Sequence, residues 1–307
     1  MGAGSTRALA DVNEHQVHIH INLDVPVVKL QQALGRVLSL TAYALHCNDV
    51  ATSTSFALPA STFELHLGVP VDWTPAQARQ DAANWHLACG LRDAVEFVNL
   101  FLDEVNKALS GWQLAIRSAR AESVTLSDMK RAIDDQPAHF HKLGMPDKIR
   151  AITSEYNFST DDVLTHHVLS INAARRCLVH RFGLVGSMDS TRDGVLSVTW
   201  QRLAVSIAGP SGERIVIPPA IASGGELVRM VTQQQAKTFA LGSQVSFTQQ
   251  EFAELLWTFL SFGLSTLERL KHYASVHGLT INEASAAAIH PQAEAGDAGG
   301  SPVEPLQ

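Results

Sequence analysis

One long amphipathic segment, from Thr74 to about Gly111, limits the folds that this chain can adopt. Thr74 as an N-cap, Pro75 at the first helical position and Gln77 as the partner that completes a capping box predict where a helix begins. Apolar residues then recur at every third or fourth position, which is the spacing of one helix face. They are Trp85, Leu91, Val95, Val98, Leu102, Val105 and Leu109. A single helix cannot bury such a face, so the sequence predicts a bundle in which other helices cover it.

Further segments with helical spacing of apolar residues supply those covering helices. They are residues 26–47, 127–156, 160–182 and 249–277, the second of which is interrupted by prolines and a glycine. Ser159 with Asp162 is expected to form a capping box at the start of the third segment. Thr248 with Glu251 is expected to form one at the start of the fourth. Gly183 is expected to end the motif-bearing third segment.

The period of the apolar residues changes from helical to alternating after residue 194. Residues 195–208 and 213–218 are typical of two strands around the turn GPSG, and residues 237–247 suggest a third extended piece. The predicted fold is therefore mainly α, a helical bundle with a small antiparallel β insert at about 195–247, before the last helix.

A single domain over residues 25–280 accounts for these elements, since neither half of the chain has a complete pattern of its own. Residues 1–24 are predicted to be a leader in which positions 17–23 alternate like a short strand. Residues 281–307 contain four carboxylates and no Lys or Arg, a composition that predicts a disordered acidic tail.

The segment SINAARRCLVHRFG, residues 170–183, places two adjacent arginines and a histidine near the end of a predicted helix. An imidazole such as that of His180 can move protons near neutral pH, and the guanidinium groups of Arg175 and Arg176 can bind phosphate. The pattern resembles the motif of the HEPN superfamily (higher eukaryotes and prokaryotes nucleotide-binding). In that motif an Arg, usually followed by a polar residue, is separated from a His by four to six residues near the end of a helix.

The resemblance implies a helical bundle, dimerisation across the motif helix and, in active members, metal-independent cleavage of RNA. It assigns Arg175 and His180 to the motif and puts Arg176 where these proteins usually have Asn, Asp or His. His180 would then be the acid/base, and Arg175 or Arg176 would bind the scissile phosphate. The second cation either strengthens phosphate binding or indicates that the catalytic geometry has been lost.

Helical geometry favours a different pairing within the same segment. At about 100° per residue, Arg175 falls within the apolar stripe, whereas Asn172, Arg176 and His180 lie together on another face. Asn172 and Arg181 are the expected substrate-binding residues beside this pair. The apolar stripe consists of Leu164, Val168, Ile171, Leu178 and Phe182.

A purely structural role is the alternative for each of these residues. Arg175 would be a buried cation paired with Glu96 or Asp103 of the long helix. His180 would be a helix C-terminal residue favoured by the helix dipole, and Arg181 a solvated C-terminal cation.

No other motif predicts a cofactor or a metal centre, and none is expected. The three cysteines form no C-x-x-C pair. The pairs His18 with His20 and His139 with His141 lack a third ligand at a diagnostic spacing. The formal net charge of −7 argues against nucleic-acid binding over the whole surface, so an RNA site must be local.

These observations lead to two alternative functions. The first is a cytoplasmic, homodimeric endoribonuclease or RNA-binding protein of a bacterial defence or toxin–antitoxin type, with RNA and a protein partner or antitoxin as its partners. The second is a non-catalytic dimerising scaffold or nucleotide-sensing module, whose β insert and acidic tail contact another protein. No apolar run approaches the length needed to cross a bilayer, so no membrane partner is expected.

Overall fold

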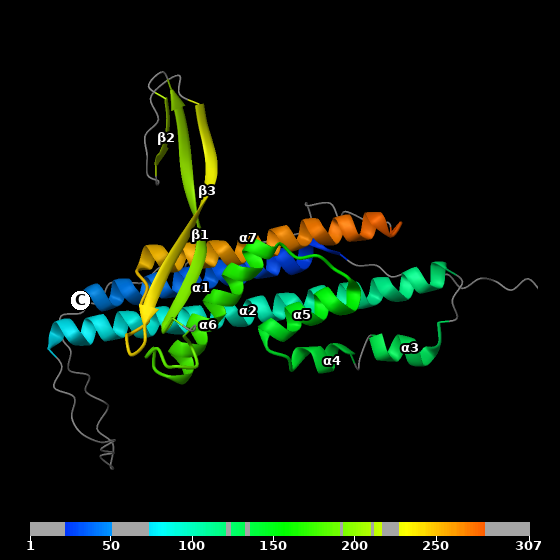
Figure 1. The fold of residues 1–307 in the computed structure, drawn as a ribbon, viewed down its shortest axis with the longest axis horizontal. Helices are drawn as coiled ribbons and strands as arrows, with labels where there is room; N and C mark the ends of the chain where they lie inside the picture. The colour runs from blue at the N-terminus through cyan, green and yellow to red at the C-terminus, as the bar shows by residue number, and fades with distance from the viewer. Residues whose placement is uncertain are drawn as a thin grey trace, which may run out of the picture.

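Three long helices form the body of the molecule. The computed structural model describes residues 22–50, 74–120, 124–132, 136–190, 193–209, 212–216 and 227–279. Helices α1 (Asp24–Val50), α2 (Pro75–Ala119) and α7 (Gln249–Val276) run along its length, with α1 packed against both others (Figure 1). The prediction of a mainly α fold built on a helical bundle is confirmed.

Helix α2 begins at the predicted capping box. The backbone N–H of Gln77 donates to the Thr74 hydroxyl (3.3 Å), and the backbone N–H of Thr74 donates to the Gln77 side-chain oxygen (3.0 Å). The helix continues past Gly111, where its end was predicted, to Ala119. It does so because Trp112 is buried and extends the apolar face by another turn.

Trp85 does not belong to the apolar face of α2, contrary to the prediction. Its side chain is 64% exposed. The buried face of the helix begins at Leu87. At about 100° per residue, Trp85 points roughly 200° away from Leu87, so its indole faces solvent.

The predicted segment 127–156 is divided into short helices, as its prolines and glycine suggested. They are α3 (Leu126–Lys130), α4 (Gln136–His141) and α5 (Met145–Tyr156). Pro146 lies in the first turn of α5, where its missing N–H is not needed. Both α4 and α5 pack against α2.

Helix α6 (Asp162–His180) carries the predicted motif and lies against α2, α7 and the sheet. The capping box predicted from Ser159 is wrong. Asp161 is the N-cap, and its carboxylate accepts a hydrogen bond from the backbone N–H of Leu164 (3.0 Å). The Ser159 hydroxyl instead accepts from the guanidinium of Arg269 on α7 (3.3 Å).

The end of α6 lies close to Gly183, as predicted, and the chain returns to the core at Val185, but Phe182 stays outside it. Phe182 was expected in the apolar stripe, and its side chain is 89% exposed. Phe182 has φ +53° and Gly183 has φ +81°, so the backbone is left-handed at both positions. The helical period stops there, which directs the phenyl ring away from the bundle.

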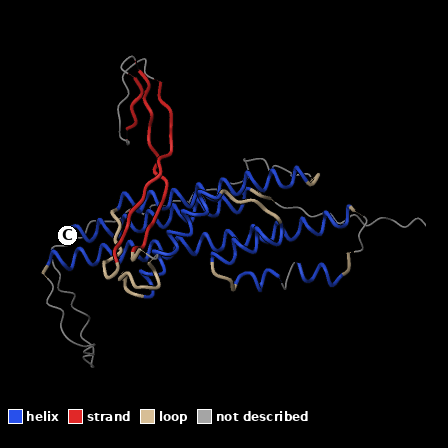
Figure 2. The backbone as a smooth tube through the Cα atoms, viewed as in Figure 1, coloured by secondary structure: helices blue, strands red, loops and turns tan. Residues whose placement is uncertain are grey.

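The β insert is a three-stranded antiparallel sheet with the strand order β2-β1-β3. Its strands are β1 (Val195–Gly209), β2 (Gly212–Val216) and β3 (Leu227–Ala240). The third strand was predicted at 237–247, ten residues later than where it begins. Residues 241–247 instead form a turn that returns to the bundle, because Gly242 has φ +79°. The sheet projects from the bundle as an arm (Figures 1 and 2).

The base of the arm is fixed to α7 and α6 by buried polar groups. The Glu254 carboxylate on α7 accepts from the indole N–H of Trp200 (2.7 Å) and from Arg202 Nε (2.7 Å), both on β1. On α6, His167 Nδ1 lies 2.7 Å from the hydroxyl of Thr199 on β1. These contacts position the motif helix against the sheet.

Some predictions concern residues outside those described, namely the strand at 17–23 except for its last two residues, and the tail at 281–307. Among the described helices, none combines the length and the apolar character that a membrane span requires.

Candidate functional site

Arg176 and His180 are both exposed near the C-terminus of α6. They are four residues apart and therefore neighbours on one helix face. Within the part of the chain that the structure describes, neither side chain has a hydrogen bond or an ion pair. Their cationic and imidazole groups are free to meet a ligand.

Arg181 is held in an ion pair and is not a solvated cation. Its guanidinium donates through Nε and Nη2 to the carboxylate of Asp189, in the loop that follows α6. These hydrogen bonds raise the pKa of Arg181 and hold the pKa of Asp189 below its usual range, against the opposing effect of burial. The charge of Arg176 acts on Asp189 in the same direction. Arg181 therefore holds the loop in place, and its guanidinium N–H groups that bind Asp189 are not available to a ligand.

Asn172 and Arg175 lie deeper than the exposed pair. Asn172 is buried, and Arg175 is half-buried with its Nε atom enclosed and without a hydrogen-bond partner. The predicted pairing of Arg175 with Glu96 or Asp103 is wrong. Glu96 accepts from a neighbouring asparagine on α2, and Asp103 has other partners. The structure thus brings Arg176 and His180 together at the surface and leaves Arg175 beneath it.

A nearby thiol offers no nucleophile. Cys177 is fully buried on α6, and burial raises the pKa of its thiol. Its Sγ donates to the backbone carbonyl of Leu184 (3.2 Å), which helps to hold the loop after α6. Of the polar side chains in residues 170–183, Arg176 and His180 are the exposed ones.

A hollow lies at the end of α6, and its lining includes Asp81, Arg92 and Gln244 as well as apolar side chains. Trp85 of α2 and Val179 and Phe182 at the end of α6 line a cavity of about 670 Å³. Further exposed apolar side chains follow in the loop and turn beside it, namely Leu184, Met188 and Leu241. Exposed apolar side chains gathered in this way are typical of an interaction surface.

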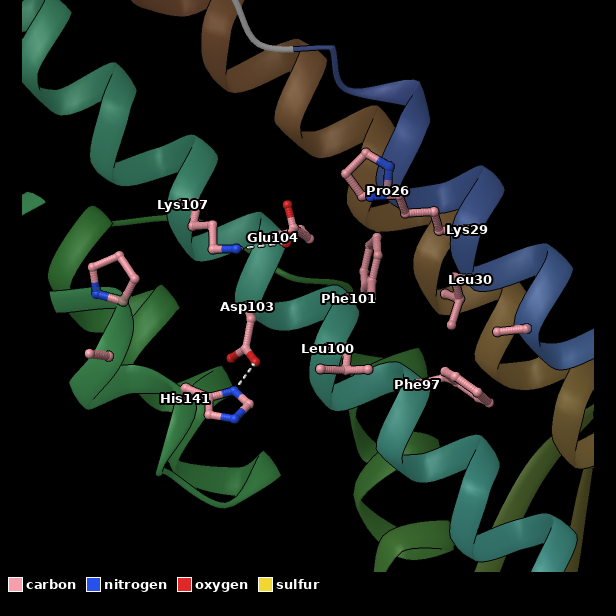
Figure 3. A pocket seen from close by; sticks show the side chains of 13 residues that line it. Pro26, Lys29, Leu30, Phe97, Leu100, Phe101, Asp103, Glu104, Lys107 and His141 are labelled. Carbon is pink, nitrogen blue, oxygen red and sulfur yellow. Dashed lines mark hydrogen bonds and ion pairs between the residues drawn. The ribbon is translucent and has the colours of Figure 1, made fainter. Parts of the chain in front are cut away.

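A second polar cluster lies further along α2, at a cavity between α1, α2 and α4 (Figure 3). Asp103 accepts from Lys148 Nζ through one carboxylate oxygen (2.6 Å), and its other oxygen lies 2.7 Å from His141 Nδ1. The Lys148 side chain is only 2% exposed, whereas that of His141 is 62% exposed. The cluster joins a buried ammonium, a carboxylate and an accessible imidazole.

Sequence reasoning missed this cluster. Asp103 interrupts the apolar face of α2, and Lys148 precedes the buried Ile149, so each is a charged residue at a core position. That signal was available, but nothing in the sequence pairs positions that lie 45 residues apart. His141 was considered only as a metal ligand with His139. Among the described residues, no group of three or more His, Cys, Asp or Glu side chains could hold a metal ion.

Comparisons of this chain with protein-family models, curated proteins and solved structures found no match. The choice of a function therefore depends on the side chains described above.

Proposed function

We propose that this protein binds RNA at the C-terminal end of α6 and cleaves it without a metal ion, as a HEPN-like endoribonuclease. The observation that carries the proposal is the exposure of Arg176 and His180 on one helix face, with no partner among the described residues. A cation and an acid/base that neighbouring side chains leave unoccupied can both act on a phosphodiester.

The chemistry needs only these two groups. The imidazole of His180 accepts the proton of a ribose hydroxyl as its oxygen attacks the adjacent phosphorus and forms a cyclic phosphate. The bond to the leaving oxygen breaks, that oxygen takes up a proton from water, and the imidazolium returns its proton to the solvent. The guanidinium of Arg176 stabilises the negative charge that develops on the phosphoryl oxygens. In this proposal Arg176 replaces Arg175 as the phosphate ligand, because the Nε atom of Arg175 is buried.

We propose that the active form is a homodimer. One copy presents Arg176 and His180 on an open helix surface, where water competes for the phosphate. A second copy that covers the hollow at Trp85 and Phe182 would bring two motif helices together and double the local positive charge. The exposed apolar side chains beside the motif support this arrangement.

A non-catalytic interaction module is the second candidate, and a specific observation favours it. Arg181 is held by Asp189 and Asn172 is buried, so two of the predicted site residues have structural environments. The arm formed by the sheet would then serve as the contact for a protein partner (Figure 2).

One experiment separates the two candidates. The purified protein is incubated with single-stranded RNA in a chelating buffer, and cleavage rates are compared for the wild type, His180→Ala and Arg176→Ala. We expect each variant to lose activity by about a hundredfold or more. His166→Ala on the same helix and Arg36→Ala on α1 are matched controls, since both side chains are exposed and lie away from the pair. Absence of cleavage by the wild type at high concentration would favour the interaction module.

A further inference from the structure

The imidazole of His141 is oriented by a charged partner that is itself fixed in place. Asp103 is buried and receives the Lys148 ammonium at 2.6 Å, so its carboxylate is charged and acts only as an acceptor. Because Asp103 Oδ2 lies 2.7 Å from His141 Nδ1 and a carboxylate can only accept, this contact favours the neutral tautomer that carries its hydrogen on Nδ1. The Nε2 atom is then left with a free lone pair, held in a defined direction.

This imidazole forms part of the wall of a cavity of about 620 Å³ between α1, α2 and α4 (Figure 3). The volume lies in the range of small-molecule sites. Most of the wall is apolar, and its aromatic part comes from Phe97 and Phe101 of α2. Leu30 of α1 and Leu100 of α2 complete the apolar surface.

The charges at the cavity wall largely neutralise one another. Glu104 accepts from Lys107 at 2.8 Å, and Asp103 is satisfied by the buried ammonium behind it. Lys29 also lines the wall, is exposed and has no hydrogen bond or ion pair with a described residue, so an anion would find this one unpaired cation but would lose its hydration on entering an apolar space. A neutral ligand with one hydrogen-bond donor fits the wall better, since His141 offers one oriented acceptor.

We propose that this cavity binds a small, neutral, flat apolar molecule that carries a hydroxyl group, of the phenol class, whose O–H donates to His141 Nε2. The aromatic side chains favour a flat ring through stacked or edge contacts. The site does not depend on Arg176 or His180, so it stands or falls separately from RNA cleavage.

The test uses two ligands that differ only in the donor, β-naphthol and its methyl ether. Binding to the full-length protein is measured by calorimetry at a pH of about 8, where an ordinary imidazole is neutral and a phenol keeps its proton. We expect wild-type protein to bind β-naphthol more tightly than the ether. His141→Leu, which keeps an apolar wall, should weaken β-naphthol binding about three- to tenfold and leave the ether unchanged.

His139→Leu is the matched control, because His139 lies on the same helix, is exposed and lines a different cavity. It should bind both ligands as the wild type does. The ring-proton resonances of His141, assigned by their loss in His141→Leu, should shift when β-naphthol is added to the wild type. Absence of β-naphthol binding, an equal loss of both ligands in His141→Leu, or an equal effect of His139→Leu would each overturn the proposal.

Discussion

The ion pair between Asp103 and Lys148 makes a strong prediction about stability. The Lys148 side chain is only 2% exposed. Replacing Asp103 with leucine, which has a similar volume, removes the counter-charge of this buried ammonium. Its remaining acceptor is the backbone carbonyl of Asn99, at 3.3 Å. Removal of one partner from a buried pair costs about 3–5 kcal/mol, because the other charge stays desolvated. We expect Asp103→Leu to lower the free energy of unfolding by that amount.

The two halves of the pair are not equivalent. Lys148→Met should cost less than Asp103→Leu, because the Asp103 carboxylate keeps His141 as a partner and its side chain is 11% exposed. The double variant replaces both charges with apolar groups, which is often neutral or stabilising. It should therefore unfold within about 1 kcal/mol of the wild type, since neither charge is left desolvated. The coupling between the two positions is then several kcal/mol.

Urea denaturation followed by circular dichroism measures all four proteins under one condition. Asp147→Ala is the control, since Asp147 pairs with Arg150 on the surface of α5, with both side chains more than half exposed. It should lower the urea midpoint far less than Asp103→Leu does, since it removes only an exposed pair and a carboxylate in the first turn of α5. The reasoning fails if Asp103→Leu unfolds at the wild-type midpoint, or if the double variant is as unstable as the two single changes added together.

Three further predictions concern the base of the arm and the end of α6. Glu254→Gln should lower the free energy of unfolding by about 1–3 kcal/mol, measured in urea, because Arg202 loses its charged acceptor. Burial, reinforced by the charge of His166, holds the pKa of His167 below its ordinary value, so the unfolded chain takes up this proton first as the pH falls. Stability should decrease as the pH drops below about 6.5, and His167→Gln should show a smaller decrease over the same range. Phe182→Gly should fold normally, since its φ of +53° suits glycine, and should lower the dimer fraction in sedimentation experiments, whereas an unchanged fraction would exclude Phe182 from the interface.

The helices could be predicted because their signals are local. Thr74 and Thr248 each cap a helix through residues only three positions away, so the capping boxes are visible in the sequence. The start of α6 was misplaced for the same reason, since Ser159 and Asp161 are both good caps and lie two residues apart. Arg269 of α7 contacts both residues across the bundle, the Ser159 hydroxyl at 3.3 Å and the Asp161 carboxylate at 3.7 Å, and such tertiary contacts are not visible in the sequence.

The position of β3 could not be predicted because the arm leaves the bundle. In the middle of this strand, Thr232, Gln234 and Ala236 are exposed, and the residues that alternate with them are only half-buried. No apolar face has to be covered there, so the sequence contains no clear period of two. What fixes the strand is its continuous pairing with β1, from Val195 opposite Ala240 onward, which is a tertiary property.

The burial of Arg175 and Arg176 indicates which of them can reach a phosphate, whereas their spacing from His180 in the sequence does not. The carboxyl-terminal half of α6 packs its buried side through Ala174 and Cys177, both fully enclosed. Both arginines lie between these two positions in the sequence, but Arg175 is half-buried with its Nε atom enclosed, whereas Arg176 is exposed. A rotation of α6 that exposed Arg175 would also move Cys177, and it would break the hydrogen bond from Cys177 Sγ to the backbone carbonyl of Leu184. If RNA binds at this helix, its phosphate therefore meets Arg176 first, and Arg176→Ala should reduce binding without unfolding the protein.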